Sequence, residues 1–200
     1  MNKVITISRE FGSGGRTIGR KVALKLGIKC YDQELIEEIA KQSGFAEEYI
    51  KERGEYMASS GIVAFFGGRD YNGHSIQDEL WGIQRKVIEN IAEKEPCVIV
   101  GRCADYILKD KAELLTVFIH SSVESRAARI VNVYGETEEA PEKRLKDKDK
   151  RRKAFYQLYT DLKWGDVRNY QVALDSGIIG IDKCADIICE LYRGFGIHKR

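Results

Sequence analysis

The chain has 200 residues, of which 43% are hydrophobic, and its 33 Lys and Arg against 31 Asp and Glu give a formal net charge of +2. This composition excludes a disordered chain, a collagen-like repeat and a small disulfide-stabilised protein, because a chain of this length can bury a core without metals or disulfides. The balanced charge argues against a surface dedicated to nucleic acid. We therefore expect a single domain over residues 1–200.

Cysteine usage and the N-terminus predict a cytoplasmic protein with reduced thiols. The five cysteines are odd in number, widely spaced and never arranged as CxxC, which fits neither a disulfide framework nor a zinc site. The N-terminus lacks a signal-peptide pattern, and no apolar run approaches the ~18 residues of a membrane span. We expect neither a membrane nor a nucleic acid as a partner.

The first part of the chain reads as strand, glycine loop, helix and second strand. An apolar run at residues 4–7 stops at a polar, glycine-rich stretch, 8–17, and apolar residues then recur at helical spacing over 18–26. Another short apolar run, 28–31, predicts a strand. Asp32 follows it and is placed to cap the next helix.

Further along, apolar runs alternate with helical patterns. The strand-like runs cover residues 97–100, 114–119 and 171–174, and the helical patterns cover 75–94, 122–133 and 181–192. Strands that are buried on both faces and alternate with helices are typical of a parallel α/β sheet. The sequence therefore predicts an α/β fold.

Two segments interrupt this alternation. Residues 44–73 combine glycine and aromatic residues without a clear period, apart from a short helical stretch at 46–53, and we predict a loop or flap there. Residues 135–153 pass from acidic to basic, and a helix is predicted to continue to Tyr159. Taken alone, this charged stretch is interpreted as a solvated helix face with charge pairs.

The glycine loop has the composition of a phosphate site. Its residues are Gly12, Ser13, Gly14, Gly15, Arg16 and Thr17. The amides and dipole at the start of a helix attract anions, and glycine allows close approach of the backbone to a ligand. Arg16 would clamp phosphates, and Thr17 would offer its hydroxyl to phosphate-bound Mg²⁺. The alternative is an ordinary turn, although three glycines in four residues exceed what a turn requires.

Three stretches resemble the cytidylate kinase-like family. They are ITISREFGSGGR at residues 5–16, LGI with YD at 26–32, and CVIVGRCAD at 97–105, and the similarity extends over nearly the whole chain. The resemblance implies a P-loop nucleoside monophosphate kinase fold: a three-layer α/β/α arrangement around a five-stranded parallel sheet, with a helical lid. It also implies transfer of the ATP γ-phosphoryl group, with Mg²⁺, to a nucleoside monophosphate or similar small phosphate-bearing acceptor.

The resemblance further implies roles for individual residues. Arg102 corresponds to a family arginine that contacts the acceptor after the third strand. Arg126 corresponds to a second such arginine at a helix start, and Arg129 is a further candidate one turn later. Asp32 is then either an acceptor contact or the helix cap.

The resemblance also implies roles for the two segments that interrupt the alternation of strands and helices. Residues 44–73 would be a flap on the acceptor side, and residues 135–160 would form the lid over the donor phosphates. Arg152 would be the catalytic lid arginine, because lid cations neutralise charge on the transferring phosphoryl group. The register against the family's lid pattern stays open: Asp149 and Arg152 match its trailing pair, and an offset of one residue fits as well.

Three departures from the family pattern motivate a second hypothesis. In an alignment without gaps the P-loop lysine falls on Gly15, and an expected acid after the third strand is Val100. Glu37 and Glu38 replace a Tyr-Arg pair of the acceptor site, where two carboxylates would repel a monophosphate. Because an arginine is not an equivalent point charge for phosphates, the alternative is a non-catalytic nucleotide-binding or regulatory protein with a degenerate P-loop.

Overall fold

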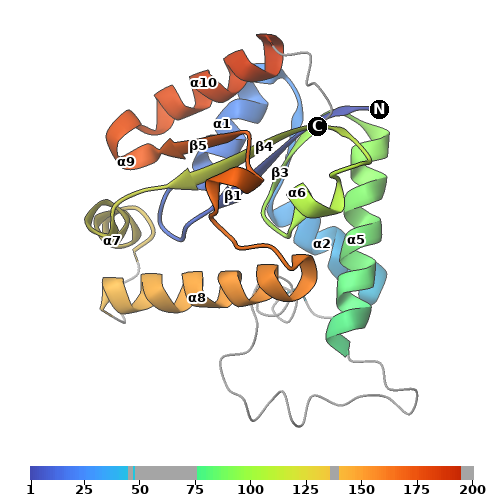
Figure 1. Ribbon diagram of the computed structural model, residues 1–200, viewed down its shortest axis with the longest axis horizontal. Helices are drawn as coiled ribbons and strands as arrows, with labels where there is room; N and C mark the ends of the chain where they lie inside the picture. The colour runs from blue at the N-terminus through green and yellow to red at the C-terminus, as the bar shows by residue number, and fades with distance from the viewer. Residues whose placement is uncertain (45–46, 48–75, 136–139, 195–200) are drawn as a thin grey trace.

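A parallel sheet forms the centre of the computed structural model, which describes residues 1–44, 47, 76–135 and 140–194 (Figure 1). The strands of this described part are β1 (Lys3–Arg9), β2 (Lys29–Tyr31), β3 (Cys97–Val100), β4 (Glu113–His120) and β5 (Val172–Asp175). They are all parallel and lie in the order β2-β3-β1-β4-β5. The predicted parallel α/β sheet is confirmed, and each predicted strand is present.

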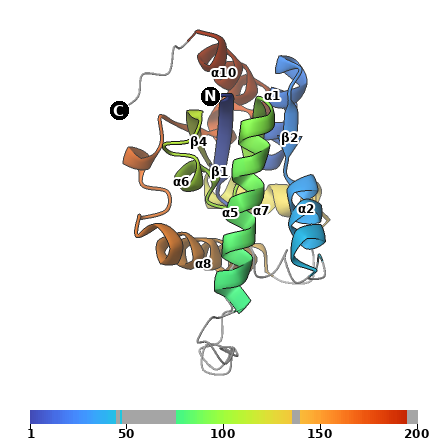
Figure 2. The same cartoon turned by 90° about the vertical axis from the view of Figure 1, so that its right-hand side faces the viewer.

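Helices cover both faces of the sheet. They are α1 (Gly15–Leu26), α2 (Gln33–Ser43), α5 (Ile76–Lys94), α6 (Ala104–Ile107), α7 (Val123–Asn132), α8 (Pro141–Thr160), α9 (Ser176–Ile179) and α10 (Ile181–Gly194), with a 3₁₀ turn at Val167–Asn169. α1 and α10 pack on one face, while α2, α5 and α6 pack on the other. Figure 2 shows α5 lengthwise in front of the sheet with α2 beside it. The three-layer arrangement is therefore confirmed.

The side-chain alternation of the strands explains the two cores. In β1, Val4 packs against α2 and α5, whereas Ile5 and Ile7 pack against α1 and α10. β4 divides in the same way, with Leu114 on the first face and Leu115 on the second. Successive residues of a strand point to opposite faces, so a sheet with two covered faces needs the uninterrupted apolar runs that the sequence shows.

The segment predicted as a lid, residues 135–160, contains the helix α8, and its residues 136–139 lie outside the described ranges. α8 is not the solvated helix that its charge suggests. α8 and α10 lie at opposite ends of the molecule in both views (Figures 1 and 2). α8 buries Phe155 and Tyr156 in a third cluster with Phe118 of β4. It also buries two charged residues, Asp149 and Arg152, because both have polar partners in the glycine loop and at the end of β1.

Other predictions have mixed outcomes. The five cysteines are free thiols, as predicted, and burial raises the pKa of Cys97 to about 12, which keeps that thiol protonated. No helix in the described ranges has the length and apolarity needed to cross a membrane. The predicted flap, residues 44–73, lies outside the described residues except for positions 44 and 47.

Substitutions at two positions of α1 test how this helix packs against the core. Ile18 is fully buried, whereas Leu24 on the same helix is 84% exposed. We expect Ile18→Ala to lower the free energy of unfolding by about 2–5 kcal/mol, because it leaves a cavity in the core. The control Leu24→Ala should stay within about 0.5 kcal/mol. Urea unfolding of both variants checks this, and equal effects would contradict the packing of α1.

Candidate functional site

The glycine loop is a tight, internally bonded turn between β1 and α1. Gly12 and Gly14 adopt left-handed backbone conformations, with φ of 79° and 80°, which glycine tolerates without strain. The buried Ser13 holds the turn: its hydroxyl donates to the carbonyl of Glu10 at 2.9 Å and to that of Ile119 at 3.2 Å. The loop is therefore fixed against the ends of β1 and β4.

The start of α1 has backbone amides without partners within the helix. Gly14 occupies the N-cap position without a capping side chain, and Ile18 donates a hydrogen bond to the Gly14 carbonyl at 3.0 Å. The N–H groups of residues 15–17 precede that bond and have no partner within the helix. No acidic residue occupies the first turn. This arrangement attracts anions, and it is the feature that the sequence predicts for a phosphate loop.

Arg16 contacts Asp32, so the structure brings two predicted site residues together. Arg16 Nε lies 3.1 Å from Asp32 Oδ1, and Arg20 Nη2 lies 3.6 Å from Asp32 Oδ2. The Asp32 side chain is only 5% exposed, while that of Arg16 is 54% exposed. Asp32 stands at the N-cap position of α2 but makes no capping hydrogen bond, because its carboxylate is taken up by the two guanidinium groups of α1.

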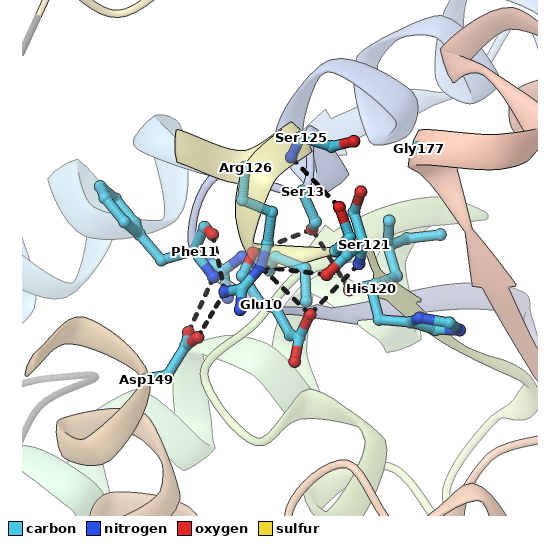
Figure 3. Close-up of polar contacts among 12 residues, drawn as sticks. Glu10, Phe11, Ser13, His120, Ser121, Ser125, Arg126, Asp149 and Gly177 are labelled. Carbon is cyan, nitrogen blue, oxygen red and sulfur yellow. Dashed lines mark hydrogen bonds and ion pairs between the residues drawn. The ribbon is translucent and has the colours of Figure 1, made fainter. Parts of the chain in front are cut away.

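Arg126 connects three parts of the molecule (Figure 3). Its Nε donates to the Ser121 carbonyl at 3.1 Å, and its Nη1 donates to the Phe11 carbonyl at 3.2 Å and to Asp149 Oδ2 at 2.6 Å. Glu10 Oε2 lies 3.4 Å from the same Nε. The Phe11 amide in turn donates to Asp149 Oδ1 at 2.8 Å. Arg126 therefore ties the end of β4 to the glycine loop and to α8.

The charged residues of α8 divide between a buried and an exposed side. Asp149 and Arg152 are both buried, and Arg152 Nη1 donates to the Arg9 carbonyl at 3.0 Å. Asp147 instead pairs with Arg151 at 3.0 Å along the same helix. The buried face of α8 thus carries Asp149 and Arg152, and the register of the lid pattern stays a prediction.

Three buried arginines line a small cavity. The cavity is bounded by Ser8, Arg9, Gly101, Arg102, Cys103, Arg152, Phe155, Tyr156 and Trp164, and its volume is about 20 Å³, enough for about one water. Arg102 follows β3 in a left-handed conformation, with φ of 61°, and its Nη1 donates to Gln84 Oε1 at 3.4 Å. The sequence predicts Arg102 and Arg152 as site residues. Arg9 receives no role from the sequence, although it lies in the polar stretch after the first apolar run.

Asp105 is part of the contact between α6 and α8. Its buried carboxylate accepts a hydrogen bond from the Tyr156 hydroxyl at 2.7 Å. Burial raises the pKa of Asp105 above its ordinary 3.8, although the Tyr156 bond acts in the opposite direction. The part of the chain that the structure describes holds no group of three His, Cys, Asp or Glu side chains that could bind a metal ion.

The buried contacts of Arg126 lead to the first prediction for this site. We expect Arg126→Met to lower the free energy of unfolding by about 3–5 kcal/mol, because it leaves the buried Asp149 carboxylate without its charge partner. The matched control is Arg85→Met, which removes an exposed pair with Glu89 and should cost about 0–1 kcal/mol. Urea unfolding measures both. Similar losses in the two variants would contradict the buried network.

Because the pKa of Asp105 is raised, we expect the free energy of unfolding to depend on pH. Because the folded state binds this proton more tightly than the unfolded state, stability should fall as the pH rises above 3.8 towards the raised pKa. Asp105→Asn removes the titrating carboxyl, so the free energy of unfolding of the variant should rise relative to that of the wild type as the pH increases. Unfolding free energies between about pH 4 and pH 8 check this. Parallel pH profiles would contradict it.

Solved structures share this fold. An uncharacterised protein from Eubacterium ventriosum is 28% identical with a TM-score of 0.74, and the match covers 97% of this chain and 100% of that one. Shikimate kinase from Acinetobacter baumannii, solved with shikimate, is 17% identical with a TM-score of 0.55, covering 99% and 96% of the two chains. A gluconokinase from Sinorhizobium meliloti is 20% identical with a TM-score of 0.52, covering 96% and 94%. The last two show the fold alone, that of P-loop kinases.

Comparison with protein families gives a more specific result. No curated protein matches the chain. A family model for the cytidylate kinase-like family matches residues 4–178, which span the sheet from β1 to β5 and include the glycine loop and α8. The resemblance seen in the sequence is thereby confirmed, and the chain belongs to the cytidylate kinase-like family.

Proposed function

We propose that this protein transfers the γ-phosphoryl group of ATP, with Mg²⁺, to a nucleoside monophosphate or a similar small phosphate-bearing acceptor. The observation that carries the proposal is the open start of α1, where a glycine loop presents helix amides that lack partners within the helix. Membership of the cytidylate kinase-like family supports it. The kinase-type neighbours, at under a quarter identity, support the fold only.

The donor phosphates would bind at the amides that begin α1. Oxygen atoms of a polyphosphate are strong acceptors, and the positive end of the helix dipole adds to the attraction. Phosphoryl transfer needs positioning and charge stabilisation more than covalent chemistry from the protein. The fixed geometry of Ser13 and the glycines on either side fits that requirement, because a rigid loop holds the donor in one place.

The acceptor would bind near Arg102, where the arginine-lined cavity lies at the carboxyl ends of β1 and β3. In open α/β sheets ligands bind at this edge. The cavity has room for about one water, so we propose that α8, which supplies Arg152, moves outward when an acceptor enters. The contacts of Arg126 and Asp149 with the loop then define the closed position.

The glycine loop offers only a poor protein ligand for Mg²⁺. Thr17 is the predicted contributor, but Arg129 Nη2 lies 3.3 Å from its hydroxyl oxygen. A guanidinium beside that oxygen repels a second cation. Val100 supplies no carboxylate at the end of β3. The geometry therefore fits an ion that arrives on the nucleotide phosphates and takes its ligands from them and from water, as Mg²⁺ does in many kinases.

A second candidate function is nucleotide binding without transfer. The observation that favours it is the contact of Arg16 with Asp32, because the arginine that the sequence offers as the phosphate clamp has a carboxylate partner elsewhere. Both candidates predict nucleotide binding, and turnover separates them.

The test is ADP formation from Mg-ATP with a panel of ribo- and deoxynucleoside monophosphates and a no-acceptor control. We expect acceptor-dependent ADP, and we expect Arg102→Ala to lower kcat/KM for the acceptor roughly 10- to 100-fold through loss of charged hydrogen bonds. The matched control is Arg85→Ala on α5, which should keep wild-type rates. Saturable ADP binding without turnover would leave the second candidate, and absence of binding would overturn both.

A further inference from the structure

Arg129 of α7 reaches the open start of α1. Its Nη2 lies 3.3 Å from Thr17 Oγ1 in the first turn. Its guanidinium carbon lies so close to the N-cap glycine, Gly14, that a Cβ atom added there would come within 3.1 Å of it. The guanidinium therefore stands beside the amides at which we propose that phosphates bind.

Arg129 retains donors for a ligand, unlike its neighbour on α7. The guanidinium of Arg126 donates to two carbonyls and a carboxylate. Within residues 1–44, 47, 76–135 and 140–194, Arg129 has one long hydrogen bond, to Thr17, and its buried Nε has no hydrogen-bond partner. A guanidinium carries five N–H donors, and a buried donor without a partner is unfavourable. An anion at the start of α1 would satisfy such donors.

A ring contact of Arg129 and the position of Arg16 both support Arg129 as the cation at the start of α1. The guanidinium carbon of Arg129 lies 6.0 Å from the centre of the Tyr134 ring, a distance at which a cation and an aromatic face attract. Arg16, the cation that the sequence offers for the loop, is held by Asp32 at 3.1 Å instead. Of these two arginines, Arg129 is the one that contacts the first turn of α1 through its side chain.

We infer that Arg129 supplies the phosphate-binding cation of the loop, in place of the lysine that the loop lacks. The ligand of Arg129 is the polyphosphate of a nucleoside di- or triphosphate. This inference rests on the proposed function, since it assigns a residue to the same donor site. It replaces Arg16, the clamp predicted from the sequence, with a residue from another helix.

The experiment measures binding of ADP, adenosine and inorganic tripolyphosphate by calorimetry, without Mg²⁺, to the wild type, Arg129→Ala and Arg16→Ala. Arg129→Ala should weaken ADP and tripolyphosphate binding roughly 10- to 100-fold, as expected for lost charged hydrogen bonds, and leave adenosine binding unchanged. Arg16→Ala should change both phosphate affinities less than about twofold, because Arg16 pairs with Asp32 instead. Arg129→Lys, which keeps the charge, should recover part of the loss.

Three results would overturn the inference while leaving the proposed function in place. They are loss of tripolyphosphate binding in Arg16→Ala with none in Arg129→Ala, similar losses in the two variants, and loss of ADP but not tripolyphosphate binding in Arg129→Ala, which would assign Arg129 to the base. A wild type that binds neither ADP nor tripolyphosphate would overturn the proposed function itself. Thermal unfolding is measured for each variant, and Arg129→Gln replaces Arg129→Ala if that variant is unstable.

Discussion

The buried pair of Arg126 and Asp149 is the interaction on which the arrangement of the site depends. Removing two charges from water is costly, and a buried pair is tolerated when hydrogen bonds satisfy the remaining donors and acceptors. Here the Phe11 amide donates a hydrogen bond to Asp149, and Arg126 donates hydrogen bonds to two backbone carbonyls. The pair thereby joins the loop to α8, and the position of α8 in turn brings Arg152 to the carbonyl of Arg9 and closes the arginine-lined cavity.

The fold could be predicted from the sequence because its determinants are local. An apolar run such as residues 97–100 is typical of a strand covered on both faces, and β3 has these same bounds. Gly27 stands where a helix must end, and it adopts the left-handed conformation that such an end requires. The glycine loop was recognisable for the same reason, since its composition and its place between strand and helix are adjacent in the chain.

The partners of the charged residues could not be predicted, because they depend on which elements meet in space. Spacing alone placed Asp32 at the start of α2, but its contact with Arg16 requires α1 and the end of β2 to lie together. α8 is the clearest example. Its composition suggests a helix surrounded by water, and only the packed structure shows that Asp149 and Arg152 face the loop and the end of β1.

The turn after β3 has a consequence for how this chain can evolve. Gly101, Arg102 and Cys103 follow one another with φ of 79°, 61° and 54°. For the two residues that are not glycine this conformation is strained, at a cost of about 1–3 kcal/mol each. Replacing Arg102 with glycine would relieve that strain and delete the guanidinium in one step. The same replacement would remove the contact with Gln84 and leave a void where the buried side chain lies. Retention of this arginine in a lineage would therefore not by itself mark selection for the chemistry of the site.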